Sequence, residues 1–131
     1  LVDNLQKDTD LAAKGLRAFL EGFVVAEPTG KQNTFAAHNQ PEFVAVSVRH
    51  NTAPSNFSNA FETALRVRKD ESLTKVSAET LVEKAKKLRA VYGDGGRTFV
   101  LNLTEIKLDG FGTAVSTLKE LLEHSLAAVK E

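Results

Sequence analysis

The run from Phe43 to Val48 constrains the fold of this chain more than any other stretch. It reads F-V-A-V-S-V and is nearly continuously apolar and rich in β-branched residues. Such a run is typical of a β-strand that is covered on both faces, and such strands usually lie in the centre of a sheet. We therefore expect a small sheet with this strand at its centre and helices packed against it.

One helix is expected before this strand in the sequence and another after it. Apolar residues at helical spacing predict the first over Thr9 to Ala26, with Thr9 or Asp10 as its N-cap. It must end before Pro28, because proline disfavours helical geometry in the residue before it. The same spacing predicts a second helix that begins near Phe57 and ends in Arg66 to Lys69, cations that suit a helix C-terminus.

A third helix is expected from Ser77 as N-cap to Gly93 as C-terminal stop. Its apolar face is predicted to carry Leu81, Val82, Ala85, Leu88 and Tyr92.

The remaining elements are a short β-compatible segment, a strand and a last helix. The short segment is Thr34 to Ala37, and the strand is Thr98 to Leu103, with Phe99, Leu101 and Leu103 on one face. The final amphipathic helix is expected from Thr113 onward. About four helices interleaved with a small sheet predict an α+β or α/β fold in a single domain, 1–131.

Composition excludes several classes of protein. There is no cysteine, so disulfides and thiolate sites are excluded, and the seventeen basic residues balance seventeen acidic ones, which argues against a wholesale polyanion binder. No apolar run is long enough to span a membrane, so we expect a soluble protein that fits a reducing cytoplasm. The chain has no methionine, which we interpret as the mark of a fragment or a processed piece.

No motif points to catalysis, a metal or a cofactor. The three histidines (His38, His50 and His124) lie far apart in the sequence and lack carboxylates at ligand spacing. The sequence G-D-G-G after Tyr92 lacks the strand-before, helix-after setting of a dinucleotide loop. We expect a protein that is not an enzyme and that holds no metal or cofactor.

The polar turn between the first helix and the Phe43 strand is the main candidate for a site. It contains Gly30, Lys31, Gln32, Asn33 and Thr34. Free backbone N–H groups beside a lysine, an amide and a hydroxyl are what a phosphate or sugar contact requires. A solvated loop is the alternative, and the residues alone favour it.

Two basic clusters and several phenylalanines leave a further choice open. The clusters are Arg66 to Lys69, and Lys84, Lys86, Lys87 and Arg89; they fit either a track for a nucleic-acid backbone or the solvated face of a helix. Among the aromatic residues, burial is expected for Phe43, Phe57 and Phe61, and Phe35 is the open candidate for stacking on a base.

Three blocks in order resemble a known family. They are P-T-G-K-Q-N-T-F-A-A-H-N-Q-P-E-F-V-A-V-S-V, then S-N-A-F-E-T-A-L, then a helix ending in A-V-Y-G. Together they are similar to the C-terminal part of the CasC family, the repeated backbone subunit of the type I-E CRISPR Cascade surveillance complex. The resemblance covers about Glu27 to Leu103, and the tail after Leu103 shows no convincing match.

The resemblance implies a fold, partners and sites. It implies part of a palm built on an RRM-like or ferredoxin-like sheet, whose copies polymerise along the guide RNA (crRNA) in antiviral defence. Other Cascade subunits and target DNA are further implied partners, whereas catalysis and a membrane are not implied. The implied RNA contacts are the turn Gly30, Lys31, Gln32, Asn33 and Thr34, and Arg49 is predicted as a further one.

A different class of function also fits the residues. A small ferredoxin-like module that binds a protein or a small ligand would explain the neutral net charge and the lack of a coherent basic stripe.

Overall fold

The computed structural model describes residues 1–26, 40–50, 55–93 and 96–130. Their contacts divide the chain into two compact units, Leu1–Pro41 and Glu42–Glu131. Each unit is treated by itself below. The expectation of a single domain stays a prediction, and the β-compatible segment Thr34 to Ala37 lies outside the described residues.

The first unit contains the short 3-10 helix η1 (Asp3–Leu5) and the helix α1 (Thr9–Val25), so the first predicted helix is confirmed to within one residue. Its N-cap is Asp8 rather than Thr9 or Asp10. The Asp8 carboxylate accepts a hydrogen bond of 2.8 Å from the backbone N–H of Leu11. A carboxylate at this position satisfies one of the unpaired donors of the first turn.

The second unit is built on a mixed sheet of three strands among the described residues: β1 (Phe43–Arg49), β2 (Gly96–Asn102) and β3 (Thr113–Val115). The order is β1-β2-β3, with β1 antiparallel and β3 parallel to β2. The prediction that the Phe43 strand is central is therefore wrong, because β2 holds that place. Burial along β1 alternates, as expected of an edge strand with Ala45 and Ser47 exposed.

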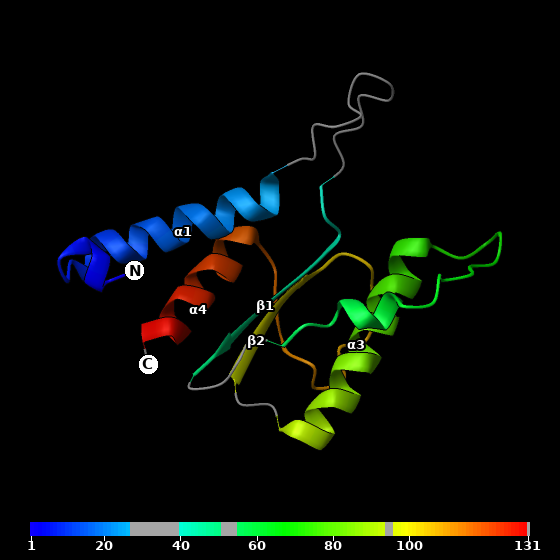
Figure 1. Cartoon of the computed structure of the whole chain (residues 1–131). Helices are drawn as coiled ribbons and strands as arrows, with labels where there is room; N and C mark the ends of the chain where they lie inside the picture. The colour runs from blue at the N-terminus through cyan, green and yellow to red at the C-terminus, as the bar shows by residue number, and fades with distance from the viewer. Residues whose placement is uncertain (27–39, 51–54, 94–95, 131) are drawn as a thin grey trace. The chain divides into compact units, whose positions relative to one another are not determined.

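One helix packs on each face of the sheet (Figure 1). On one face, α4 (Leu118–Lys130) places Leu121 and Ala128 against Phe99. Half-buried side chains complete this cluster: Val44, Val46, Val48, Leu101, Val115 and Leu118. Phe99 and Leu101 share this face as predicted, but Leu103 lies beyond the end of β2 and is exposed.

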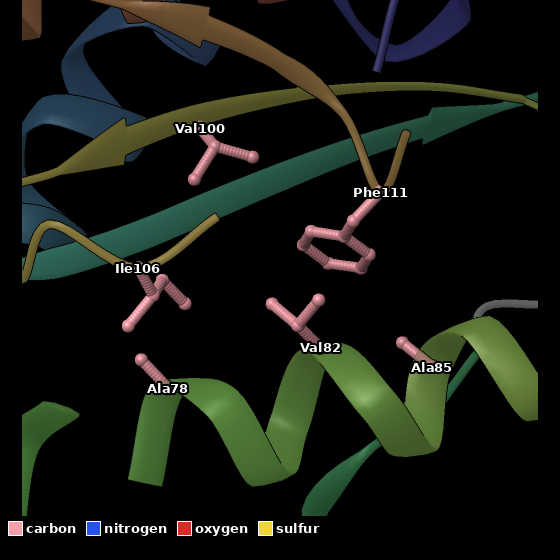
Figure 2. Close-up of a cluster of buried hydrophobic side chains, with 6 residues drawn as sticks. All are labelled: Ala78, Val82, Ala85, Val100, Ile106 and Phe111. Carbon is pink, nitrogen blue, oxygen red and sulfur yellow. The ribbon is translucent and has the colours of Figure 1, made fainter. Parts of the chain in front are cut away.

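The opposite face is covered by α3 (Leu73–Tyr92). Figure 2 shows Val82 of α3 beneath the ring of Phe111, with Val100 of β2 across the cluster. The buried members of this cluster are Ala78, Val82, Ala85, Val100, Ile106 and Phe111. Three of the six come from α3, and two of those are alanines. Helix α3 therefore contributes little apolar side-chain area to its contact with the sheet.

A single arginine fastens the C-terminal part of α3 to the sheet. Arg89 Nη2 donates to the Thr98 hydroxyl at 2.5 Å and to the Ser47 hydroxyl at 3.3 Å, and these two hydroxyls lie 2.7 Å apart. Arg89 Nη1 donates to the backbone carbonyl of Phe111, and the guanidinium lies 4.6 Å from the centre of the Phe111 ring. The same side chain therefore bonds to β1, to β2 and to the turn before β3. We name Arg89 with Ser47, Thr98 and Phe111 the arginine anchor.

Three predicted boundaries are corrected by the structure. The prediction of a helix from Phe57 to Lys69 is wrong, because only a 3-10 turn, η2 (Ser58–Phe61), forms there. A stretch this short forms a stable helix only when a whole face is buried, and here Phe57 packs into the core while Phe61 is exposed.

The third helix begins earlier than predicted. Its N-cap is Ser72, whose hydroxyl accepts from the Lys75 N–H at 3.3 Å, and Ser77 instead donates to the Leu73 carbonyl inside the helix. Gly93 ends the helix as expected, with a positive φ of 81° that favours glycine. The last helix begins at Leu118, because Thr113 to Val115 form β3.

The α+β class with a small sheet is confirmed. Among the described residues, no helix is both long and apolar enough to cross a membrane.

The α4 packing gives a first prediction. Leu121 is fully buried, so Leu121→Ala removes apolar contacts and leaves a cavity; we expect a loss of about 2–5 kcal/mol in the free energy of unfolding, measured by urea denaturation. Val129→Ala, on the same helix with 46% of its surface exposed, is the matched control and should change it by about 0.5 kcal/mol or less. Equal effects of the two changes would contradict this packing of α4.

The arginine anchor gives a second prediction. Arg89→Lys keeps the charge but loses the planar fork that bonds several acceptors at once, so we expect a loss of about 1–3 kcal/mol in the same measurement. Lys87→Ala, half a turn away, removes only an exposed pair with Glu83 and should leave the free energy of unfolding close to wild type. An unchanged Arg89→Lys variant would show that the anchor does not stabilise α3.

Candidate nucleic-acid interface

Only one of the predicted RNA contacts lies in the part of the chain that the structure describes. Gly30, Lys31, Gln32, Asn33 and Thr34 lie outside the residues that the structure describes. Arg49 is described and is the last residue of β1. The interface can therefore be examined around Arg49, while the role of the Gly30 to Thr34 turn stays a prediction.

Arg49 is held at the end of the sheet by its neighbours. Its Nη1 donates to the Ser55 hydroxyl. Its register partner in β2 is Gly96, where an added Cβ would lie 2.2 Å from the Val48 carbonyl oxygen and 2.8 Å from Arg49 Cγ. Only glycine fits at this position, because the Val48 backbone cannot move aside without disturbing the ladder. The absence of a side chain at Gly96 thus leaves the space that the Arg49 side chain occupies.

One donor of Arg49 is unsatisfied. Its Nε is buried and has no hydrogen-bond acceptor among residues 1–26, 40–50, 55–93 and 96–130. Buried donors of this kind are normally paired, and a guanidinium pairs best with an anionic oxygen such as that of a phosphate or carboxylate. Because Nε has almost no solvent-accessible surface, an anion reaches it only when the side chains that shield it move aside.

Cations outnumber carboxylates in the elements around Arg49. We name β1, residues 84–92 of α3 and β2 the basic end, because these ranges carry six cations and no carboxylate of their own. Two of the cations are paired with carboxylates just outside these ranges, Lys87 with Glu83 and Lys86 with Asp109. The cations are Arg49, Lys84, Lys86, Lys87, Arg89 and Arg97. The four on α3 also suit the negative pole of the helix C-terminus, so their presence is partly structural.

The other face of the same end is occupied by a structural contact. His50 Nε2 lies 3.0 Å from the Ala128 carbonyl oxygen of α4, and since a carbonyl can only accept, Nε2 is the donor. His124 stacks on Phe99 at 5.5 Å between ring centres. These two histidines join α4 to the sheet. No group of three or more metal-ligating side chains occurs in the searched, described part of the chain.

A hollow of about 820 Å³ lies on α3 against residues 105–109 and shares Lys86 and Lys87 with the basic end. Its floor includes Val82 and Ile106, but its charged rim is mixed: Lys75, Glu79, Glu83, Lys86, Lys87, Glu105, Lys107 and Asp109. Lys87 bonds Glu83 at 2.6 Å and thereby lowers the pKa of that carboxyl. A rim with as many carboxylates as ammonium groups gives no field that would favour a polyanion.

The basic clusters and aromatic residues from the sequence can now be assigned. In the α3 cluster, Arg89 belongs to the arginine anchor and Lys86 lies 3.9 Å from Asp109. Arg66 to Lys69 lie outside any helix, where the Glu71 carboxylate accepts from the Arg68 backbone N–H.

Among the aromatic residues, Phe43 and Phe57 pack on the core as predicted, whereas Phe61 is 40% exposed and Phe35 lies outside the described residues. Tyr92 was expected in the core and is instead 80% exposed.

Comparisons with known proteins identify the family. The family model described as "CT1975-like protein" matches residues 1–124, and no curated protein matches the chain. A solved structure titled "CRISPR RNA-guided surveillance complex" contains a chain that is 30% identical, with a TM-score of 0.84 over 97% of this chain and 48% of that one. A second, titled "CRISPR RNA-guided surveillance complex, pre-nicking", is 28% identical, with a TM-score of 0.83 over 98% of this chain and 34% of that one.

The present chain thus spans about half or less of the length of these structural relatives. The predicted resemblance to Cascade backbone proteins is confirmed at the level of family, and the match includes the tail after Leu103, where the sequence alone shows no convincing resemblance. The chain belongs to the family of CT1975-like proteins.

Proposed function

We propose that this chain is part of a non-catalytic scaffold subunit that binds guide RNA in a CRISPR surveillance complex and polymerises along it. The observation that carries the proposal is the likeness, over 97% of the chain, to a subunit of a structure titled as an RNA-guided surveillance complex. The proposed partners are guide RNA, further copies of the subunit, other Cascade subunits and target DNA. A role in antiviral defence, the type I-E assignment and a cytoplasmic location rest on the sequence resemblance.

The geometry of the described residues supports contact with the RNA backbone rather than with base edges. The basic end offers guanidinium groups and hydroxyls, which bind phosphate oxygens whatever the sequence. A coat for guide RNAs of changing sequence needs this property. Helix α4 covers one face of the sheet, and α3 covers the β2 part of the other face, where Ala45 and Ser47 of β1 stay exposed. The open places of this part of the chain are therefore that side of β1, the ends of the sheet and the loops.

The test measures RNA affinity of the assembled subunit against salt concentration. Each phosphate contact releases counterions, so we expect affinity to fall steeply with salt, and Arg49→Ala and Lys31→Ala each to reduce the logarithmic slope by about 1. Lys119→Ala is the matched control, because Lys119 is exposed on α4 beside Glu123 and outside the basic end. It should leave the slope unchanged.

Two results would contradict the proposal in different ways. If the subunit binds no RNA, the proposed function is wrong. If it binds RNA but Arg49→Ala and Lys31→Ala match the Lys119→Ala control in affinity and slope, the assigned contacts are wrong.

A further inference from the structure

Tyr92 is an exposed aromatic residue at the edge of the basic end. It is the last residue of α3, with 80% of its surface exposed, and it is the only tyrosine in a chain without tryptophan. A single exposed apolar residue is ordinary on a protein surface. Its position relative to Arg49 and Arg89, however, indicates a functional role.

The arginine anchor places Tyr92 and Arg49 on the same side of the sheet. Arg89 bonds to Ser47, and Tyr92 follows Arg89 by three residues, about 4.5 Å further along the helix axis. Arg49 follows Ser47 by two residues, about 7 Å further along β1, and strand alternation places it on the same face. The chain then runs from the end of α3 to Gly96, the register partner of Arg49. Both side chains therefore lie beyond the anchor, at one end of the sheet.

The chemistry of this pair matches a nucleotide. The Nε of Arg49 has no acceptor among the described residues, and an anionic oxygen would satisfy it once the side chains that shield this buried nitrogen move aside. The exposed ring of Tyr92 offers a flat face on which a base can stack. The ranges of the basic end contain no carboxylate, but Glu83 and Asp109 beside them pair with Lys87 and Lys86 and weaken the attraction for a polyanion at those two lysines. A peptide without acidic residues would use the ring alone and would leave the guanidinium without its anion.

We propose that Tyr92 stacks on a base of single-stranded RNA while Arg49 binds an adjacent phosphate, with Arg89 positioning the helix that carries the ring. This inference rests on the proposed guide-RNA function and assigns to that function a base-stacking residue. Stacking tolerates any base, because every base has a π-face, so the contact adds affinity without adding sequence preference.

The experiment compares two probes on the full 131-residue chain. One is a short single-stranded RNA of mixed sequence, and the other is an abasic ribose-phosphate strand of the same length; binding is followed by fluorescence anisotropy at fixed low salt. We expect Tyr92→Leu to weaken RNA binding about 5- to 100-fold, in line with the cost of removing one stacking contact, and Tyr92→Phe to keep wild-type affinity. The abasic strand should bind equally to all three proteins.

Two further readouts make the test specific. Leu103→Ala, which removes an exposed apolar side chain beyond the opposite end of β2, is the control and should bind RNA like wild type. Since Tyr92 is the sole tyrosine, its fluorescence should be quenched by the RNA and not by the abasic strand. Unchanged urea midpoints show that the variants are folded.

The outcomes separate this inference from the function on which it rests. If wild type binds RNA but Tyr92→Leu binds it equally well, or loses as much affinity for the abasic strand, the stacking role is wrong and the proposed function stands. The same holds if Tyr92→Leu abolishes self-association in size-exclusion chromatography without weakening RNA binding, because the ring would then serve a protein interface. If wild type binds neither strand, the proposed function fails as well.

Discussion

The position of α3 depends on the side chain of Arg89. The apolar contacts of this helix come largely from Ala78, Val82 and Ala85, and alanine buries little surface, so hydrophobic packing alone fixes the helix weakly along its axis. A guanidinium carries several N–H donors in one plane, and here it bonds to both strands and to the Phe111 carbonyl while stacking on that ring. These directional bonds to three segments fix the position of α3 along its axis. They therefore also fix the position of Tyr92, the last residue of the helix.

This arrangement has a consequence for RNA recognition. An RRM sheet binds single-stranded RNA through aromatic residues on an open face. Here α4 covers one face of the described sheet and α3 covers the β2 part of the other, where Ala45 and Ser47 of β1 stay exposed, and the residues beneath α3 are apolar or belong to the arginine anchor. The exposed ring of Tyr92 and the unpaired Nε of Arg49 lie instead beyond the anchor, where α3 and β1 end. Under the proposed function, this part of the protein would therefore bind RNA at the end of the sheet rather than on its face.

The sequence predicted the fold class, the strands Phe43 to Val48 and Thr98 to Leu103, and three of four helices, because apolar periodicity is local and strong there. It failed where the outcome depends on distant partners. The run at Phe43 looked central because alanine and serine at its exposed positions do not reveal an open face. Thr113 to Val115 looked helical because three residues are too few to show strand alternation, and their parallel partner Phe99 to Leu101 is not adjacent in the chain.

Only part of the site could be predicted from the sequence, because the rest depends on contacts between residues that are distant in the chain. Arg49 could be named because it ends a clear strand, but its unsatisfied Nε and its place opposite Gly96 depend on register. Tyr92 continues the helical spacing of Leu81 and Leu88 and was therefore assigned to the core. Beyond the arginine anchor, the apolar face of α3 no longer packs against other residues, and the ring of Tyr92 remains exposed to solvent. A helix stop directly after an aromatic residue, here Gly93, is the one local signal that could have drawn attention to it.

Hydrogen–deuterium exchange of the chain with and without single-stranded RNA tests most directly whether the RNA meets the basic end. The account predicts that RNA slows amide exchange at the end of β1, in the last turn of α3 and at the start of β2, and leaves α4 unchanged. Protection confined to α4, or no protection anywhere in a chain that demonstrably binds the RNA, would contradict it.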